Sequence, residues 1–268
     1  MRELRSRVGA ALRALGLRPT PVTVQTASNP IPSPVALAML GLLAERRAMS
    51  GGGLRLVQVG ANPSDGDPVQ PVFDLLGRNS RMLLIEAHPA AFVRLSEKYA
   101  NDDRIVLVNA FVGRPGDGLF ALRPEFEDRY QQVKGRPADR ISSGHYDWVA
   151  QRIANRLGLR DSEVVHALER IDVPVRSLEA ICREAGFDSF DVLQIDAEGK
   201  DVEILEAFNP VDFGVRIVNF ESAELADARA GVISRLEESG FALIADTEDS
   251  LCLRLGSGCP SEQIPADV

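Results

Sequence analysis

Residues 54–62 read Leu-Arg-Leu-Val-Gln-Val-Gly-Ala-Asn, and the fold follows from this stretch and its surroundings. Residues 54–59 are mostly branched or apolar, which is typical of a strand buried on both faces of a sheet. The strand runs directly into a glycine turn at Gly60-Ala61-Asn62. A buried strand that enters such a turn is the first indication of an α/β domain.

Helices and strands alternate on both sides of this stretch. A helix is predicted at 34–49, before the strand. After it the pattern predicts a helix at 69–76, a strand at 82–85, a helix at 90–99 and a strand at 105–108. Strands separated by helices of this length pair in parallel through right-handed crossovers. The first half of the chain therefore predicts a doubly wound sheet.

The regular alternation stops after Phe111 and resumes with apolar strands at 192–195 and 217–220. Between them the sequence predicts a strand at 119–122, a polar segment through Gly144, helices at 146–157 and 161–170, a strand at 173–175, and a helix at 178–185. We interpret about 111–175 as an insertion that binds the acceptor over the carboxyl ends of the strands.

The last elements predict how the sheet ends. A helix at 231–239 is followed by strands at 241–245 and 251–255, joined by a short polar turn. Two strands joined so closely pair antiparallel. A mostly parallel, Rossmann-like sheet of seven strands with an antiparallel terminal hairpin is the class I methyltransferase plan. A two-halved dinucleotide fold lacks this hairpin.

The two ends of the chain are expected to lie outside this domain. Apolar residues at Leu4, Val8, Leu12 and Leu15 fall on one face of a short helix. That helix could pack on its own domain, join two subunits in a homodimer or lie on a membrane surface. We expect a helical extension with a proline-rich connector at 1–50, the methyltransferase domain at 51–258 and a tail at 259–268.

Composition limits the classes of partner. The 268 residues include 30 Lys and Arg against 39 Asp and Glu, a formal charge of -9, which disfavours binding to nucleic acid. The three cysteines form no CxxC pair, and no apolar run approaches the roughly 18 residues that a membrane span needs. We therefore expect a soluble cytoplasmic protein.

Ligands of open α/β sheets bind outside the carboxyl ends of the strands. There Gly60 allows close approach of a ligand, and Asn62 can bond to the ligand or cap the next turn. Glu86 ends the second strand, where a carboxylate can accept hydrogen bonds from both hydroxyls of a ribose. Gly60-Ala61-Asn62 is not the GxGxxG dinucleotide signature. The predicted topology points instead to S-adenosylmethionine as the ligand, and this molecule has no pyrophosphate for such a signature to hold.

Three residues are candidates for the chemistry itself. Asp196 and Glu198 follow a buried strand, so either could hold the ligand amino group, orient an acceptor or act as general base. Glu198 could instead cap the next helix. His145 lies in a polar loop and could take a proton from an acceptor hydroxyl, or be a surface or capping residue.

The sequence does not predict a zinc site. There are only three histidines, and the cysteines and histidines are not clustered. His88 precedes Pro89 at the start of a predicted helix and His166 lies inside one, so we interpret both as structural. Asp196 and Glu198 could bind Mg²⁺, although we do not predict that they do.

Together these motifs resemble the FkbM-type methyltransferases. The resemblance is carried by residues 56–62, Gly66-Asp67-Pro68, 84–89, 191–199, Asn219-Phe220-Glu221 and Asp246-Thr247. It implies S-adenosylmethionine bound by Gly60, Asn62, Glu86 and Asn109, with Asp196 near the sulfonium. Their motif neighbours Gln58, Ala87 and Ala110 are assigned to the same site. Ser143, within residues 142–145, resembles the family's loop over the cofactor.

The sequence departs from the family pattern in two places. Pro63-Ser64 stands where the family often has Asp-Gly, and Ala87-His88-Pro89 replaces the commoner Pro-x-Pro.

The resemblance implies O-methylation of a hydroxyl on a sugar or secondary metabolite, in natural product biosynthesis, with S-adenosylhomocysteine as product. The alternatives are a non-catalytic scaffold in a biosynthetic assembly, suggested by the altered turn, and a nucleotide-dependent oxidoreductase.

Overall fold

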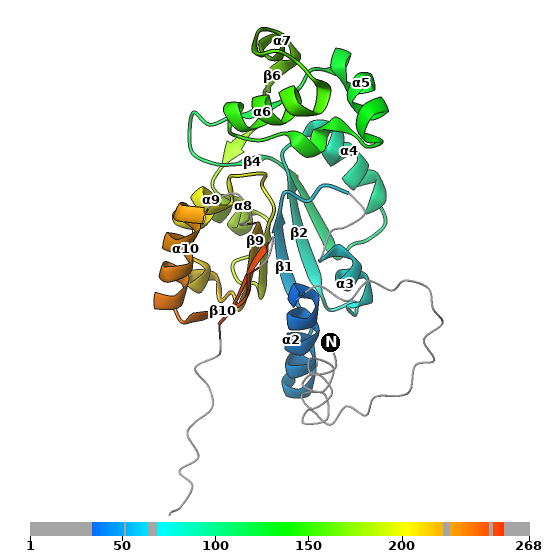
Figure 1. Ribbon diagram of the computed structural model, residues 1–268. Coiled ribbons are helices and arrows are strands. Elements are labelled where there is room, and N and C mark those ends of the chain that lie inside the picture. The colour runs from blue at the N-terminus through cyan, green and yellow to red at the C-terminus, as the bar shows by residue number, and fades with distance from the viewer. Residues whose placement is uncertain (1–33, 51, 64–68, 222–225, 247–248, 255–268) are drawn as a thin grey trace, which may run out of the picture. The chain divides into compact units, whose positions relative to one another are not determined.

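The computed structural model describes residues 34–50, 52–63, 69–221, 226–246 and 249–254. The N-terminal helix, most of the proline-rich connector, the C-terminal tail, Gly66-Asp67-Pro68 and Thr247 lie outside the described residues. All of the described residues belong to one compact unit, which begins at Ser33. Its centre is a seven-stranded sheet with helices on both faces (Figure 1).

The strand order of the sheet is β10-β11-β9-β8-β1-β2-β3. The five strands from β9 to β3 pair in parallel, whereas β11 is antiparallel to both β9 and β10. This order confirms the predicted class I methyltransferase fold with its terminal hairpin. The strands are β1 (Arg55–Val59), β2 (Arg81–Glu86), β3 (Ile105–Asn109), β8 (Val192–Ile195), β9 (Ile217–Glu221), β10 (Phe241–Asp246) and β11 (Asp249–Arg254).

Side chains of the central strands alternate between two hydrophobic cores, because successive residues of a strand point to opposite faces. Leu56 and Leu84 pack in one core, whereas Val57 and Ile85 pack in the other. The first core is covered by α2 (Pro34–Ser50), α3 (Gln70–Leu75) and α4 (Pro89–Lys98), and the second by α8 (Leu178–Glu184), α9 (Asp201–Ala207) and α10 (Ala226–Glu238).

Helix α2 belongs with the sheet, so the expected domain start at residue 51 is too late. Val35, Met39 and Leu43 are buried in the same core as Leu56 of β1. The compact unit therefore begins before this helix, at Ser33, rather than after the glycine run. An apolar helix face that packs on a sheet cannot be separated from the domain whose core it completes.

The insertion has a small core of its own, and strands near its start pair with strands near its end. Strand β4 (Phe111–Val112) pairs with β7 (Val175–Arg176), and β5 (Leu119–Leu122) pairs with β6 (Leu168–Ile171). Buried residues such as Tyr130 and Ile153 form its core. Figure 1 shows its helices together at one end of the sheet. They are α5 (Pro124–Lys134), the 3-10 helix η1 (Ala138–Ile141), α6 (Tyr146–Leu157) and α7 (Asp161–Ala167); a second 3-10 helix, η2 (Pro210–Phe213), precedes β9.

Two predictions inside the insertion are wrong. The helix expected at 161–170 ends at Ala167, because the next four residues form β6 and pair with β5, so tertiary pairing overrides the helical pattern. The strand expected at 173–175 is β7, which begins only at Val175. Helix α5 lies in the polar segment where no helix was predicted. Its ends carry the usual signals of a helix, because Pro124 begins it and Gly135 ends it in a left-handed conformation.

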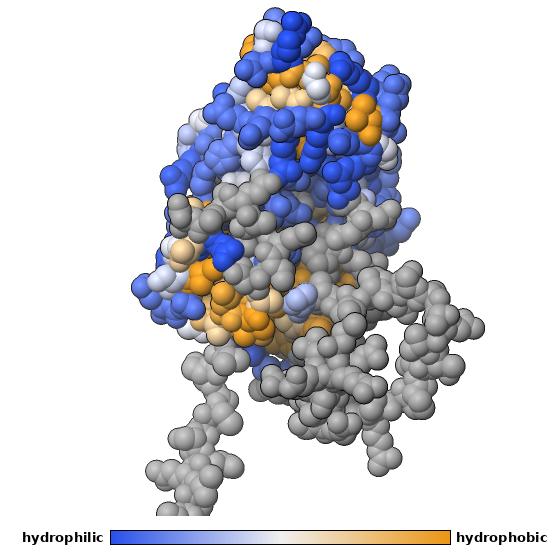
Figure 2. All heavy atoms as spheres, in the orientation of Figure 1, coloured by the Kyte–Doolittle hydropathy of each residue, from blue (hydrophilic) through white to orange (hydrophobic). Residues whose placement is uncertain are grey.

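None of the described helices is long and apolar enough to cross a membrane. In Figure 2 the visible surface of the insertion is mainly hydrophilic, with small hydrophobic areas between its charged side chains. A larger hydrophobic area lies at the opposite end of the sheet, in the part of the view where Figure 1 shows β10. Ile244 of that edge strand is 55% exposed.

Gly60 provides a test of how closely the ends of β1 and β8 pack together. Its φ is +75°, and a Cβ there would lie 1.8 Å from the carbonyl oxygen of Asp196. We expect Gly60→Ala to lower the free energy of unfolding by more than about 3 kcal/mol, because strain and a backbone clash add together. The control is Gly135→Ala, with φ +67° and open space around the new methyl group, which should cost about 1–2 kcal/mol. If urea unfolding shows the same loss of unfolding free energy for both variants, the close approach of the backbone at Gly60 does not contribute to stability.

Candidate functional site

A cavity of about 130 Å³ lies at the carboxyl ends of the central strands, beneath the insertion. The ends of β1, β2 and β8 and the residues after β3 form one side of it, and residues of the insertion form the other. Its charged and polar lining comprises Asn62, Glu86, Asp139, Arg140, Ser142, Ser143, Asp196, Glu198 and Lys200. Four of these are carboxylates from three separate parts of the chain.

Backbone hydrogen bonds hold the ends of the central strands together. The Gly60 amide donates to the carbonyl of Ile85 at 3.0 Å, and the Asp196 amide donates to the carbonyl of Val59 at 3.0 Å. Since the carbonyl of Asp196 occupies the space where a Cβ of residue 60 would lie, only glycine fits here without a shift. The carboxylates that follow β2 and β8 are thereby brought to one cavity.

The turn after β8 is strained and held by a buried carboxylate. Glu198, with φ 49°, is the non-glycine residue with positive φ among the described residues, and Gly199 follows with φ +95°. Asp201 is fully buried and accepts from the amides of Ala197 and Glu221, both at 3.2 Å. The Asp201 side chain thus binds the backbone of this turn. Glu198 makes no such capping contact, so the alternative interpretation of Glu198 as a helix cap is wrong.

The Glu198 side chain lines the cavity in an unfavourable place for a charge. Burial raises its pKa to about 8, and the negative charges of Asp196 and Glu221 add to the shift while Arg152 opposes it. A carboxyl group with this pKa can exchange a proton near neutral pH. Strain and a perturbed pKa at one residue are typical of functional sites.

Glu86 is the second buried carboxylate that faces the cavity. One of its oxygens, Oε1, accepts from the amide of His88 at 2.7 Å. Burial raises the pKa of Glu86 to about 7, and the nearby charge of Asp139 raises it further while the His88 hydrogen bond lowers it. His88 itself caps α4 by accepting from the amide of Ala90, as expected for a structural residue.

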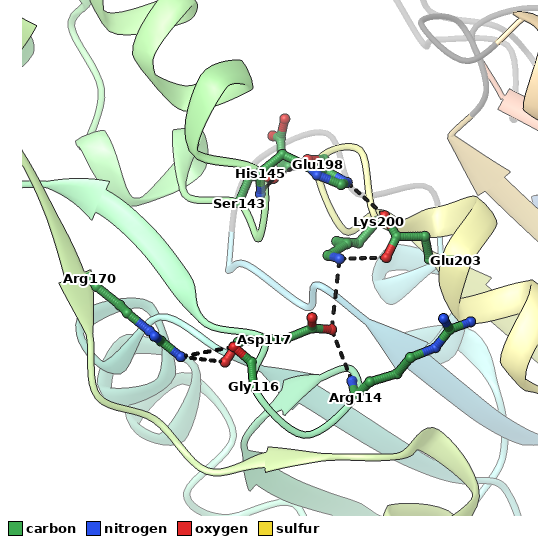
Figure 3. Close-up of polar contacts among 9 residues, drawn as sticks. All are labelled: Arg114, Gly116, Asp117, Ser143, His145, Arg170, Glu198, Lys200 and Glu203. Atoms are coloured by element: carbon green, nitrogen blue, oxygen red, sulfur yellow. Dashed lines mark hydrogen bonds and ion pairs between the residues drawn. The ribbon is translucent and has the colours of Figure 1, made fainter.

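Figure 3 shows how the insertion contacts the turn after β8. The Ser143 hydroxyl donates to the carbonyl of Glu198 at 2.7 Å, and His145 Nε2 lies 3.0 Å from Glu203 Oε1. Gly144 between them leaves room for Lys200, because a Cβ there would lie 2.5 Å from the Lys200 side chain. The loop before α6 therefore rests directly on the cavity wall.

Lys200 connects this loop to the base of the insertion (Figure 3). Its Nζ donates to Glu203 at 2.5 Å and lies 3.7 Å from Asp117 Oδ2, and its side chain is 8% exposed. Asp117 also accepts from the backbone amide of Arg114 at 2.9 Å, and Arg170 donates to the Asp117 carbonyl at 2.7 Å. This network fixes the loop between β4 and β5 against α9.

The structure brings most of the predicted site residues to the cavity. The residues that line it are Gly60, Asn62, Glu86, Ala87, Ala110, Ser143, Asp196 and Glu198. Gln58, Asn109 and His145 do not line it. Gln58 is buried within β1, and Asn109 donates to the carbonyls of Glu86 and Ala87 at 2.8 and 3.1 Å, so it holds the end of β2. His145 is turned towards Glu203.

Sequence reasoning missed Asp139 and Lys200. Lys200 directly follows the Asp196–Gly199 motif, so its position next to the site could have been inferred. Asp139 lies in the segment that was expected to be polar and irregular, and nothing in its sequence context marks it. No group of three or more His, Cys, Asp or Glu side chains placed to hold a metal ion occurs in the described part of the chain.

Comparisons with known proteins give one family match. The family model described as the Methyltransferase FkbM domain matches residues 58–243. A comparison with curated proteins finds no significant match.

Solved structures with some similarity include several methyltransferases. Precorrin-6y C5,15-methyltransferase from Geobacter metallireducens is 14% identical with a TM-score of 0.38, over 85% of this chain and 91% of that one. A putative O-methyltransferase from Klebsiella pneumoniae is 13% identical with a TM-score of 0.34, over 94% and 89%.

The raised pKa of Glu198 predicts a pH-dependent cost in stability. The folded-state pKa of about 8 lies above the ordinary 4.5, so ionisation of Glu198 costs folding free energy that accumulates between these pH values. We expect Glu198→Gln to raise the unfolding temperature at about pH 9 and to change it little at about pH 4. The exposed Glu237→Gln serves as control. An unfolding temperature for Glu198→Gln that does not exceed wild type at the higher pH would show that the carboxylate is not destabilised there.

Proposed function

Because the chain belongs to the FkbM family of S-adenosylmethionine-dependent methyltransferases, we propose that it methylates a hydroxyl oxygen of a small molecule. The observation that carries this proposal is a single cavity lined by Gly60, Glu86, Asp196 and Glu198 at the meeting point of the strand ends. When bound, S-adenosylmethionine supplies an electrophilic methyl group on a sulfonium and leaves as S-adenosylhomocysteine.

The residues of the cavity fit this cofactor. Four carboxylates line it, whereas the two cations are Arg140 and Lys200, and Lys200 is paired with Glu203. An acidic cavity suits a ligand that carries a sulfonium and an ammonium group. Glu86 offers an acceptor to the ribose hydroxyls, and Gly60 allows a close approach of the backbone.

Glu198 is our candidate for the general base. A hydroxyl oxygen that gains a methyl group must lose its proton, and a carboxyl group with a pKa of about 8 suits that transfer near neutral pH. Asp196 also lines the cavity and is the candidate for holding the cofactor amino group or orienting the acceptor. His145 is the weaker candidate base because its ring lies against Glu203. Most of the rate would come from alignment of the two reactants.

The first experiment tests the cofactor and the reaction. We expect S-adenosylmethionine and S-adenosylhomocysteine to bind in calorimetry, and NADH not to bind. Incubation with S-adenosylmethionine and a panel of hydroxylated sugars and secondary metabolites should add one methyl group to an oxygen, as seen by mass spectrometry. Absence of cofactor binding would favour the scaffold alternative, and methylation of carbon or nitrogen instead would contradict the proposed acceptor.

The second experiment tests the base. Glu198→Gln should lower kcat by roughly 10²- to 10⁴-fold, the range for loss of a general base, whereas the exposed His166→Ala should leave it unchanged. The kcat of wild type should rise with pH up to about 8, because Glu198 must be ionised to accept a proton, and the variant should lose that dependence. An unchanged kcat and pH profile in Glu198→Gln would exclude Glu198 as the base.

A further inference from the structure

Asp139 of the insertion lines the same cavity as Glu86 and is as deeply buried. It lies in η1, and its side chain is 3% exposed. Its Oδ2 accepts a hydrogen bond from Arg94 of α4. Its other oxygen, Oδ1, is buried and has no hydrogen-bond partner among the described residues.

An unpartnered oxygen of a buried carboxylate is costly, and in folded proteins such oxygens are nearly always satisfied by a donor. Arg94 already occupies the opposite oxygen, and Asp139 lines the cavity, so a ligand bound there can supply the donor for Oδ1. The cofactor of the proposed function offers donors in its ribose diol. Glu86 has Oε1 engaged by the amide of His88, and Asp139 brings a second buried carboxylate to the same cavity.

We propose that Asp139 binds a ribose hydroxyl of the cofactor, so that the insertion supplies part of the cofactor site. This inference rests on the proposed function. The ribose is then held between two carboxylates, Glu86 from the sheet and Asp139 from the insertion. Arg94 is a positioning residue, which orients Asp139 by binding Oδ2 and leaves Oδ1 for the ligand.

The direct test is the affinity for S-adenosylhomocysteine, measured by calorimetry. In Asp139→Asn the amide oxygen can still accept from Arg94, which turns the NH₂ group towards the cavity and replaces an acceptor with a donor. We expect the Kd to rise roughly 10- to 100-fold. Asp147→Asn, an exposed acid in the same insertion, is the matched control and should change the Kd less than twofold.

A ligand-side test needs no change in the protein. The 2′-deoxy and 3′-deoxy analogues of S-adenosylhomocysteine each lack one ribose hydroxyl. For one of them the loss of affinity should be large with wild type and small with Asp139→Asn, because both changes remove the same hydrogen bond. If each analogue loses as much affinity with Asp139→Asn as with wild type, the assignment of Asp139 to the ribose is overturned.

The pH dependence tests whether the charge of Asp139 acts on Glu86 at the binding site. The groups that face Glu86 are Asp139, Arg94, Asp196 and the amide of His88, and the charge of Asp139 helps to raise the pKa of Glu86. Glu86 is the stronger acceptor for a ribose hydroxyl when it is ionised, so cofactor affinity should rise as pH increases through about 7. In Asp139→Asn this rise should move to lower pH.

Each failure has a separate meaning. If wild type does not bind S-adenosylhomocysteine, the proposed function is wrong. If wild type binds and Asp139→Asn binds equally well, the inference alone is wrong. Arg94→Gln removes the ion pair but keeps the Asp139 carboxylate. An identical loss of affinity in Arg94→Gln and Asp139→Asn, with no coupling to either analogue, would assign Asp139 to anchoring the insertion and overturn the proposal.

The single tryptophan of the chain gives an independent check that these variants keep their folded site. Trp148 lies in α6 of the insertion, and a Cβ built at Gly199 would lie 3.7 Å from its indole nitrogen. Its fluorescence therefore reports on whether the insertion still rests on the turn after β8. We expect the same emission from wild type and Asp139→Asn in the absence of ligand. A shifted emission together with a lowered unfolding temperature would show that Asp139→Asn acts by displacing the insertion, and would overturn the proposal.

Discussion

The close approach of the ends of β1 and β8 is the constraint on which the rest of the site depends. The carbonyl of Asp196 lies where a Cβ of residue 60 would be, and the amides of Gly60 and Asp196 are bound to carbonyls of neighbouring strands. Parallel strands of a doubly wound sheet end at the same edge, but only backbones packed this tightly bring the following side chains into one small cavity. The fold supplies the edge of the sheet, and one glycine without a side chain allows the ends of the strands to meet.

The acidic side chains gathered there make the free protein less stable than an apolar cavity would. Burial raises the pKa of Glu86, Glu198 and Asp201, and the negative charge of Asp196 adds to all three shifts. Each of these groups weakens the fold as the pH rises above the ordinary pKa of a carboxyl group. A cationic ligand offsets that repulsion, so binding and stability are coupled at this site. The fully buried Asp201 is a structural member of the cluster, because it holds the strained turn that presents Glu198.

The sheet and half of the site could be predicted from the sequence because their signals are local. Buried strands are short apolar runs, and the residues that follow them, such as Gly60, Glu86 and Asp196, are fixed to the sheet edge by topology alone. Gln58 and Asn109 belong to the same motifs but do not reach the cavity, because a strand alternates its faces and an amide side chain can be used by nearby carbonyls. Sequence adjacency to a motif does not fix the direction of a side chain.

The insertion could not be predicted in the same way, since its position is set by contacts between distant residues. Its small core is separate from those of the sheet, so no periodic pattern relates the two. Two polar contacts bracket the cavity instead: Asp139 with Arg94 beside the end of β2, and Ser143 with the carbonyl of Glu198 beside the end of β8. Arg94 lies in α4, which begins at Pro89 shortly after Glu86, and Glu198 lies in the turn that follows Asp196. The insertion is thus attached to the elements that carry the cavity carboxylates, and displacing it would disturb both ends of the site at once.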